Sequence, residues 1–136
     1  MPSKKVTWND KLTTELRSID NDHKVLIEAF NEFVDAINAE EPTDKLCEMF
    51  QGVIDEVVRH FAFEEKVMLN IGYKGYIEHK QHHANLCADA AGILEELKAA
   101  NSAKDTLPSV NFLRALVVKH MVEQDLKIKE FVMRDV

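Results

Sequence analysis

The sequence is poor in the residues that interrupt helices. It contains only four glycines and three prolines in 136 residues, so long stretches carry no strong signal for a turn. This scarcity argues against a strand-rich fold, which needs many tight turns, and predicts an all-α protein with few connections. Because 46% of the residues are hydrophobic, the chain can bury a sizeable core, and we expect one domain over residues 1–136.

The sequence also lacks a CxxC pair, a secretory signal and an apolar run of about 18 residues. We therefore expect Cys47 and Cys87 to be reduced packing residues in a cytoplasmic protein that does not insert into a membrane. Positive charge is not in excess either, since 17 Lys and Arg stand against 24 Asp and Glu. Nucleic acid is not an expected partner, because phosphate binding requires a cationic surface.

Hydrophobic periodicity predicts four helices that follow an N-terminal arm. Residues 1–19 show no sustained helical period, and we expect them to form an extended arm. Helices are expected from residue 20 or 21 to 39, from about 43 to 71, from 76 to about 101, and from about 106–109 to at least 131. Long helices joined by short connections predict an up-down-up-down antiparallel four-helix bundle.

Polar side chains interrupt the apolar seams of these predicted helices. In the second helix the seam recurs every three or four residues, and His60 and Glu64 occupy two of its places. His79 and His83 do the same in the third helix, and His23 continues the apolar stripe of the first. Burying polar groups costs free energy unless each group is paired or ligated. These positions therefore require partners inside the bundle.

The predicted cluster has the composition of a transition-metal site. Residues four apart lie one turn apart on the same face of a helix, so His60 with Glu64, and His79 with His83, can bind a common ion. One zinc ion would use three or four ligands, and a larger set predicts two ions. Iron is the natural candidate where imidazoles predominate and carboxylates can bridge. The predicted ligands are His23, His60, Glu64, His79, His83, His120 and Asp125.

The place of Asp125 in this set is open from spacing alone. Asp125 follows His120 by five residues, which turns the two side chains about 140° apart on an ideal α-helix. It could reach the metal from one flank, or it could be a surface acid. Helical phase excludes two neighbours from the ligand set: we expect His82 at the surface or around the ligands, and Glu65 on a flank that faces water or a nearby charge.

The order of these residues resembles the hemerythrin family, especially its bacterial single-domain members. The resemblance rests on Trp8 and on the segments IDNDH at 19–23, HFAFEE at 60–65, HKQHH at 79–83 and HMVEQD at 120–125. Together these segments form an H…HxxxE…HxxxH…HxxxxD pattern that covers nearly the whole chain.

The resemblance implies a ligand assignment. One iron would be bound by His79, His83 and His120, and the other by His23 and His60. The two irons would be bridged by Glu64, Asp125 and an oxo or hydroxo group. The resemblance also implies that apolar side chains shield bound dioxygen, although they can equally be plain core residues: Leu26, Phe61, Leu116, Val117 and Met121.

The function implied by the resemblance is reversible dioxygen binding for storage or transport, without enzymatic activity or catalytic residues. Two other functions stay open. The site could sense oxygen or redox state within a larger signalling receptor, or it could belong to a diiron oxidase or peroxidase. Ferritin-like catalytic sites use four carboxylates, whereas this chain offers five imidazoles. A bundle with hydrogen-bonded core histidines is the plainest alternative, and the oligomeric state is not predicted.

Overall fold

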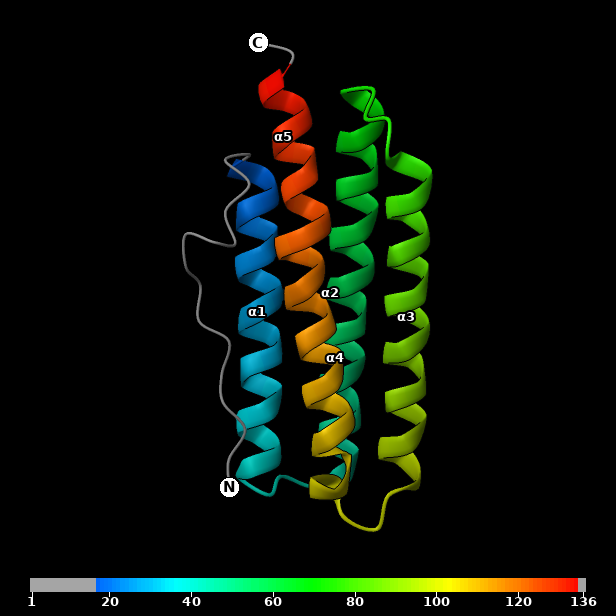
Figure 1. Ribbon diagram of the computed structural model, residues 1–136. Coiled ribbons are helices and arrows are strands. Elements are labelled where there is room, and N and C mark those ends of the chain that lie inside the picture. The colour runs from blue at the N-terminus through cyan, green and yellow to red at the C-terminus, as the bar shows by residue number, and fades with distance from the viewer. Residues whose placement is uncertain (1–16, 135–136) are drawn as a thin grey trace.

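The fold is described from a computed structural model, which places residues 17–134. These residues form helices and contain no strand. Figure 1 shows the helices as long rods that run alternately up and down beside one another. The first three rods are single α-helices, and the fourth is built from two α-helices and the turn between them. The α-helices are α1 (Arg17–Asn38), α2 (Thr43–Asn70), α3 (Tyr76–Ala99), α4 (Leu107–His120) and α5 (Leu126–Arg134).

The connections between the rods are short. A 3₁₀ turn, η2 (Ala103–Thr106), leads from α3 into α4, and a π-helical turn, η3 (Met121–Asp125), joins α4 to α5. Helix α1 packs against α2, α2 against α3, and α3 against α4. The predicted antiparallel four-helix bundle is thus confirmed. None of the described helices contains an apolar stretch long enough to span a membrane.

Backbone conformation ends the first two helices. At the end of α1, Glu40 adopts a φ of 59°, and at the end of α2, Gly72 adopts a φ of 68°. The amide of Tyr73 then donates to the carbonyl of Met68 at 2.9 Å. Such left-handed residues close helices because the following amides can reach the last free carbonyls. Sharp ends of this kind keep neighbouring helices antiparallel.

Two details of the predicted helices are wrong. Helix α1 begins at Arg17, so residues 17–19 are helical rather than part of the arm, whose remaining residues lie outside the described part of the chain. In α2, Met68 is fully buried, whereas Val67, which a strict heptad places on the seam, is only partly buried. An α-helix has 3.6 residues per turn, so its buried face drifts away from a 3.5-residue repeat.

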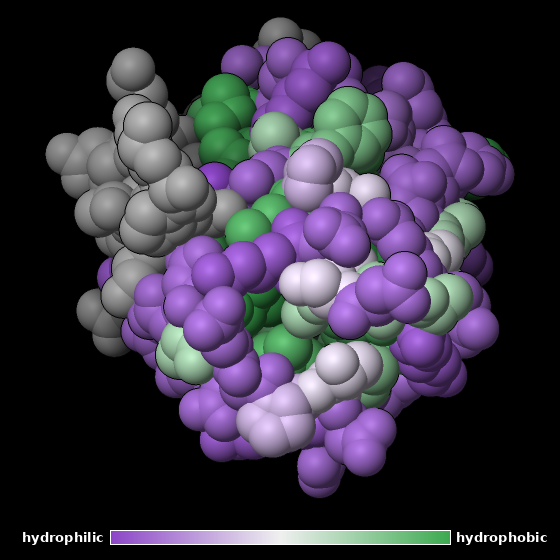
Figure 2. Space-filling model, turned by 90° about the horizontal axis from the view of Figure 1, so that it is seen from below, coloured by the Kyte–Doolittle hydropathy of each residue, from purple (hydrophilic) through white to green (hydrophobic). Residues whose placement is uncertain are grey.

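The apolar core fills the end of the bundle that contains the α1–α2 and α3–α4 connections. Phe33 and Phe50 lie 4.9 Å apart between ring centroids, and both are fully buried, as are Leu97 and Val110. Seen from this end, polar side chains form the rim and apolar side chains show between them (Figure 2). The free cysteines Cys47 and Cys87 are partly buried and pack against this core, as predicted.

Candidate metal centre

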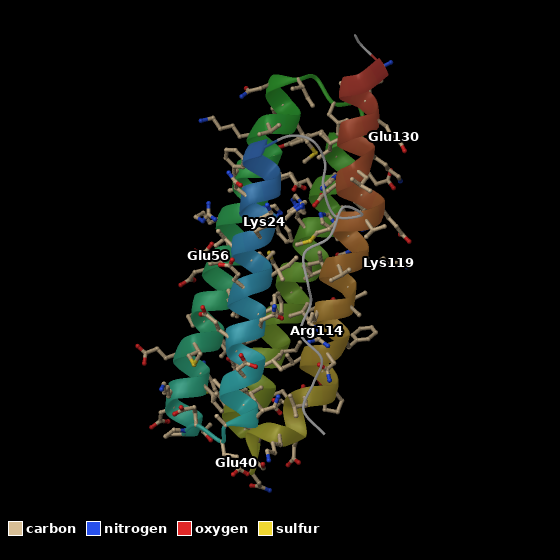
Figure 3. The ribbon with its side chains drawn as sticks, turned by 90° about the vertical axis from the view of Figure 1, so that its left-hand side faces the viewer. Lys24, Glu40, Glu56, Arg114, Lys119 and Glu130 are labelled. Atoms are coloured by element: carbon tan, nitrogen blue, oxygen red, sulfur yellow. The ribbon has the colours of Figure 1, made fainter. Side chains whose placement is uncertain are left out.

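The other half of the bundle interior contains a cluster of buried polar side chains. Each rod brings at least one of the seven predicted ligand residues to the same place, and each of the seven is at most 5% exposed. By contrast, charged side chains such as Glu56, Lys119 and Glu130 point away from the bundle axis (Figure 3). The buried residues come from α1 (His23), α2 (His60 and Glu64), α3 (His79 and His83), the end of α4 (His120) and η3 (Asp125).

Three imidazoles converge on one side of the cluster. The Nε2 atom of His120 lies 3.1 Å from Nε2 of His79 and 3.2 Å from Nε2 of His83. The Oε1 atom of Glu64 lies 2.5 Å from Nε2 of His79 and 3.1 Å from Nε2 of His83. The Oδ1 atom of Asp125 lies 2.9 Å from the Nε2 atoms of His79 and His120. Three nitrogens and two oxygens therefore face a common point.

Two imidazoles lie on the opposite side of the same carboxylates. The ring centroids of His23 and His60 are 4.8 Å apart. Nε2 of His23 lies 2.7 Å from Oδ2 of Asp125, and Nε2 of His60 lies 3.2 Å from Oε2 of Glu64. Each carboxylate thus directs one oxygen to the three-histidine side and the other oxygen to the two-histidine side. The ligand atoms form two overlapping groups, each capable of holding a metal ion, that share Glu64 and Asp125.

The π-helical turn explains how Asp125 joins the cluster. A π-helical turn pairs residue i with residue i+5, so Asp125 lies one turn beyond His120 rather than on another face. Asp125 is fully buried, and it is not the surface acid that spacing alone left possible. The assumption of an ideal α-helix over residues 120–125 was wrong. Single π turns inside α-helices frequently occur at functional sites.

The electrostatics of the cluster favour positive charge between the carboxylates. Burial lowers the pKa of His23, but hydrogen bonds with Asp125 and Glu64 outweigh this effect and raise it to about 10. Burial likewise lowers the pKa of His120, while the charge of Asp125 and a hydrogen bond to it raise the value to about 9. Without a bound cation, these imidazoles therefore hold protons at neutral pH.

The pKa values of the two carboxylates shift in the opposite direction. Burial and the negative charge of Glu64 raise the pKa of Asp125, but the positive charge of His120 and hydrogen bonds from His120 and His23 lower it to about 2. The pKa of Glu64 is well below its ordinary value, because four hydrogen-bonded histidines outweigh the effect of burial. Two buried anions thus require cationic neighbours, which can be protonated imidazoles or metal ions.

The geometry fits metal ions better than a hydrogen-bond network. Oε2 of Glu64 and both carboxylate oxygens of Asp125 are buried and lie 2.7–3.2 Å from imidazole nitrogens, but the angles of these contacts depart from those of well-formed hydrogen bonds. Ligand atoms held about 2.1 Å from one ion at right angles lie about 3 Å apart, which is close to the separations between the imidazole nitrogens of the three-histidine side. Imidazole and carboxylate together are donors suited to iron and related transition metals.

The five predicted shielding residues occupy two kinds of position. Leu26, Phe61, Val117 and Met121 are buried, whereas Leu116 is only partly buried and lines a groove beside His120 between α3 and α4. The ring of Phe61 stacks on the ring of His83, with a centroid distance of 3.8 Å and an interplanar angle of 4°. An apolar wall therefore adjoins the three-histidine side.

Sequence reasoning missed two neighbours of the cluster. Oε2 of Glu65, which we expected to face water or a nearby charge, lies 2.9 Å from Nδ1 of His83. Its position directly after Glu64, on the flank that faces α3, is the only signal in the sequence. Tyr73, in the connection after α2, places its ring 6.4 Å from the ring of His79, and no pattern predicted this. His82 is partly buried, with its ring 6.3 Å from that of His120.

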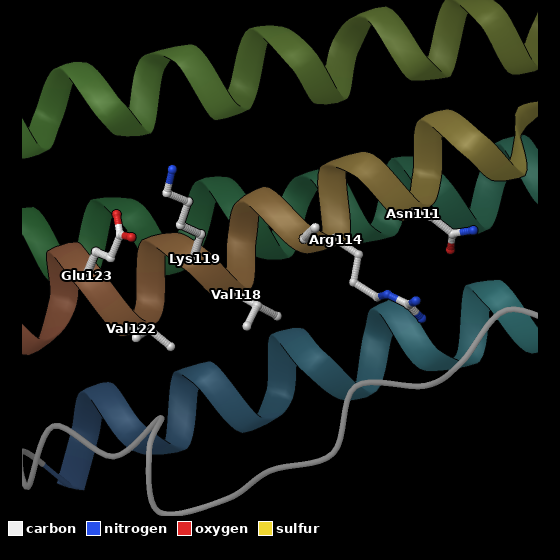
Figure 4. Close-up of a pocket in the computed structure, with 7 residues that line it drawn as sticks. Asn111, Arg114, Val118, Lys119, Val122 and Glu123 are labelled. Carbon is white, nitrogen blue, oxygen red and sulfur yellow. The ribbon is translucent and has the colours of Figure 1, made fainter.

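One groove on the surface is separate from the cluster. The groove in Figure 4 runs along α4, and Arg114 and Asn111 point from α4 into the space beside α1. None of the seven clustered residues lines this groove. The buried cluster is therefore the best candidate for the functional site in the described part of the chain.

Comparison with known proteins agrees with this geometry. A family model described as "Hemerythrin HHE cation binding domain" matches residues 14–132. A bacteriohemerythrin of Pseudomonas aeruginosa (strain LESB58) is 36% identical over 78 residues, which are 57% of this chain and 50% of that protein. This chain thus spans about half the length of that relative.

Two further matches extend over most of the chain. A bacteriohemerythrin of Methylococcus capsulatus is 28% identical over 124 residues, covering 88% of this chain and 91% of the relative. The crystal structure of a wild-type hemerythrin superimposes with a TM-score of 0.80 at 26% identity, covering 92% of this chain and 95% of that one. Sequence and structure therefore point to the same family.

Proposed function

Since the chain belongs to the hemerythrin family, we propose that it binds dioxygen reversibly at a non-haem diiron centre and serves in oxygen storage or transport. The observation that carries this proposal is the sharing of Glu64 and Asp125 by two overlapping ligand groups. A carboxylate with one oxygen in each group is placed to bridge two ions. Hydrogen bonding alone would not require such an arrangement.

The ligand assignment follows the two sides of the cluster. We assign His79, His83 and His120 to one iron and His23 and His60 to the other. Glu64 and Asp125 would be shared by the two irons, together with an oxo or hydroxo group. The two-histidine side offers one imidazole fewer, so the iron held there would be the one that takes dioxygen. When bound, the iron pair supplies the electrons that dioxygen accepts reversibly.

The surrounding residues support binding and release. The buried apolar side chains of Leu26, Phe61, Val117 and Met121 keep water away from the cluster. A dry pocket disfavours the departure of charged, reduced oxygen species, because charge is costly in apolar surroundings. Loss of oxygen as the neutral molecule is then the favoured route. We assign the partly buried Leu116 to the same role, at the groove beside His120.

The composition of the cluster supports a carrier over an enzyme. Ferritin-like catalytic sites use four carboxylates, whereas this cluster has two carboxylates and five imidazoles. A larger negative charge favours high oxidation states of iron, and the present set provides less of it. We therefore propose oxygen binding without bond cleavage.

An anaerobic oxygen titration tests this function. The purified protein is loaded with iron(II), its iron content is measured, and visible absorption is recorded through cycles of oxygen and vacuum. We expect two irons per chain, a colour that develops with oxygen, and bleaching under vacuum in every cycle. Irreversible oxidation in the first cycle would contradict a carrier and favour an enzyme or sensor.

Two adjacent histidines provide a matched control for that titration. The His83→Ala variant removes a proposed ligand that is buried in the cluster, so it should lose iron and colour. The His82→Ala variant removes a histidine that lies beside the cluster but is not part of either ligand group. It should keep both. Equal iron content in the two variants would contradict the ligand assignment.

A further inference from the structure

His83 contacts two side chains outside the ligand set, one at its ring face and one at Nδ1. Phe61 stacks on one face of its ring at a centroid distance of 3.8 Å, and Glu65 lies 2.9 Å from its Nδ1 atom. The Nε2 atom is left to face His120 and Glu64. One ring nitrogen thus faces a carboxylate outside the ligand set, and the other faces the cluster.

The other imidazoles of the three-histidine side lack this support. The Nδ1 atoms of His79 and His120 are buried and have no hydrogen-bond partner among the described residues. The three imidazoles are therefore chemically different, although they converge on the same point. Of these three imidazoles, and among the described residues, only His83 has a carboxylate at Nδ1.

A carboxylate at Nδ1 has two effects on an imidazole ligand. The Nδ1–H group donates to the carboxylate, which fixes the tautomer in which Nε2 carries the lone pair. The negative charge of the acceptor also makes the imidazole more basic and therefore a stronger donor to a metal. Stronger donation stabilises the higher oxidation state of that metal.

The Glu65 side chain is partly exposed to solvent. Its side chain is 20% exposed, and it lines a groove between α2 and α3 together with His83, Phe61 and Lys80. Water in this groove can solvate the part of the carboxylate that does not face His83, so the anion avoids the full cost of burial. The groove thus connects an otherwise enclosed ligand histidine with the protein surface.

We propose that Glu65 is a positioning residue that fixes the orientation of His83, strengthens its metal binding and lowers the reduction potential of the metal on the three-histidine side. The inference rests on the proposed diiron function, because it concerns how one ligand of that centre is tuned. It assigns to Glu65 a role through His83, with no direct contact between Glu65 and the metal.

The test compares three variants. Glu65→Gln keeps the length and an acceptor oxygen but removes the charge, and Glu65→Ala removes both. Glu56→Gln is the control, because it removes the same charge from a partly buried position on α2 where the partner is Arg59 rather than a ligand histidine. Helical circular dichroism establishes that each variant folds, and Glu65→Gln decides the question if Glu65→Ala does not fold.

Two quantities are measured for each variant: iron affinity by competition with a chelator, and the midpoint potential of the iron pair. Both Glu65 variants should bind iron about 10- to 100-fold more weakly. Their potential should rise, by about 59 mV for a one-electron step, for each tenfold weakening confined to the oxidised state. Glu56→Gln should match the wild type in both quantities.

A zinc-loaded sample adds a readout that is independent of oxygen chemistry. Long-range ¹H–¹⁵N spectra of the wild type should show a protonated Nδ1 at His83 whose hydrogen exchanges slowly, and Glu65→Ala should lose this protection. The inference is overturned if both Glu65 variants match the wild type, or if only Glu65→Ala changes, since packing would then explain the effect. A wild type that binds metal but not oxygen reversibly would defeat the proposed function while leaving this comparison measurable.

Discussion

The two halves of the bundle interior are made of different residues at equivalent places. At one end Phe33, Phe50 and Leu97 are fully buried and require no hydrogen-bond partner or ligand. At the other end the same seams carry His60, Glu64 and five further polar groups that are buried to the same degree. An apolar side chain gains roughly 1.5–3 kcal/mol on burial, whereas a polar group must find a partner to recover its desolvation cost.

This difference separates stability from chemistry along the bundle axis. The apolar half can maintain the antiparallel arrangement without help, so the polar half can be devoted to ligands. The polar half, in turn, depends on cations, either protons or metals, to remain buried. Changes in the apolar half should therefore alter unfolding in every state of the protein, whereas changes in the polar half should depend on whether metal is bound.

The largest effect is expected from deleting one residue of α2, and the same kind of deletion in η3 is its control. Deleting Arg59 from α2 rotates all later residues of that helix by about 100°, so His60 and Glu64 leave the interior and metal binding is lost. Deleting Glu123 from η3 removes the extra residue of the π turn, and Asp125 then follows His120 by four residues on one α-helical face. This variant should fold and retain metal.

Iron content and helicity of the two deletion variants check this expectation. Glu123 is exposed, so its removal costs no core packing. If deletion of Glu123 abolished metal binding as completely as deletion of Arg59, the π turn would have a role beyond placing Asp125.

A smaller effect is expected from truncating the apolar half. The Phe50→Ala variant should lose about 3–5 kcal/mol in the free energy of unfolding, because it leaves a cavity beside Phe33. The loss should be the same with and without metal, and the iron content of the folded protein should not change. Urea unfolding of both forms measures it. Phe112→Ala, which truncates a side chain that is 66% exposed, should change stability by at most about 0.5 kcal/mol.

A loss of stability in Phe50→Ala that appears only in the metal-bound form would contradict the separation of the two halves. It would mean that the apolar half is coupled to the metal centre rather than independent of it.

The smallest effect on stability is expected from a change of pH, which acts through the titratable groups of the polar half. In the metal-free protein the pKa values of His23 and His120 are raised from 6.5 to about 10 and about 9. Raised values mean that their contribution to stability is complete below pH 6.5 and is lost as the pH rises to 10. The pKa of Asp125 is lowered from 3.8 to about 2, so its contribution is present above pH 3.8 and is lost toward pH 2.

The stability of the metal-bound protein should depend on pH in the opposite way. Metals replace the protons on the imidazoles, so raising the pH from 6.5 to 10 should have little effect on the melting temperature. Acidification below the histidine range displaces the metal and should lower it. Thermal unfolding of both forms across pH 4–10 tests this, and parallel curves for the two forms would contradict the cation requirement.

Much of the site followed from the sequence because helical periodicity is regular. The seams of α2 and α3 predicted which of the neighbouring residues Glu64 and Glu65, and His82 and His83, face the interior, and the structure places Glu64 and His83 in the cluster. Periodicity could not predict where the chain departs from a regular α-helix. The π turn before Asp125 and the drift from Val67 to Met68 both change the number of residues per turn, which a fixed spacing cannot represent.

Contacts between helices could not be predicted from the sequence either. The hydrogen bond from His83 to Glu65 depends on the separation and rotation of α2 and α3, and the approach of Tyr73 to His79 depends on the shape of a connection. The residues that form the cluster could thus be predicted, whereas the residues that contact it from outside could not.

Anomalous diffraction at the iron edge, from crystals of the iron-loaded protein, tests the central claim most directly. Two neighbouring peaks should lie between Glu64 and Asp125, one surrounded by His79, His83 and His120 and the other by His23 and His60. A single peak, a peak elsewhere in the bundle, or no peak in crystals grown from protein of verified iron content would contradict the assignment of these seven residues to a pair of ions.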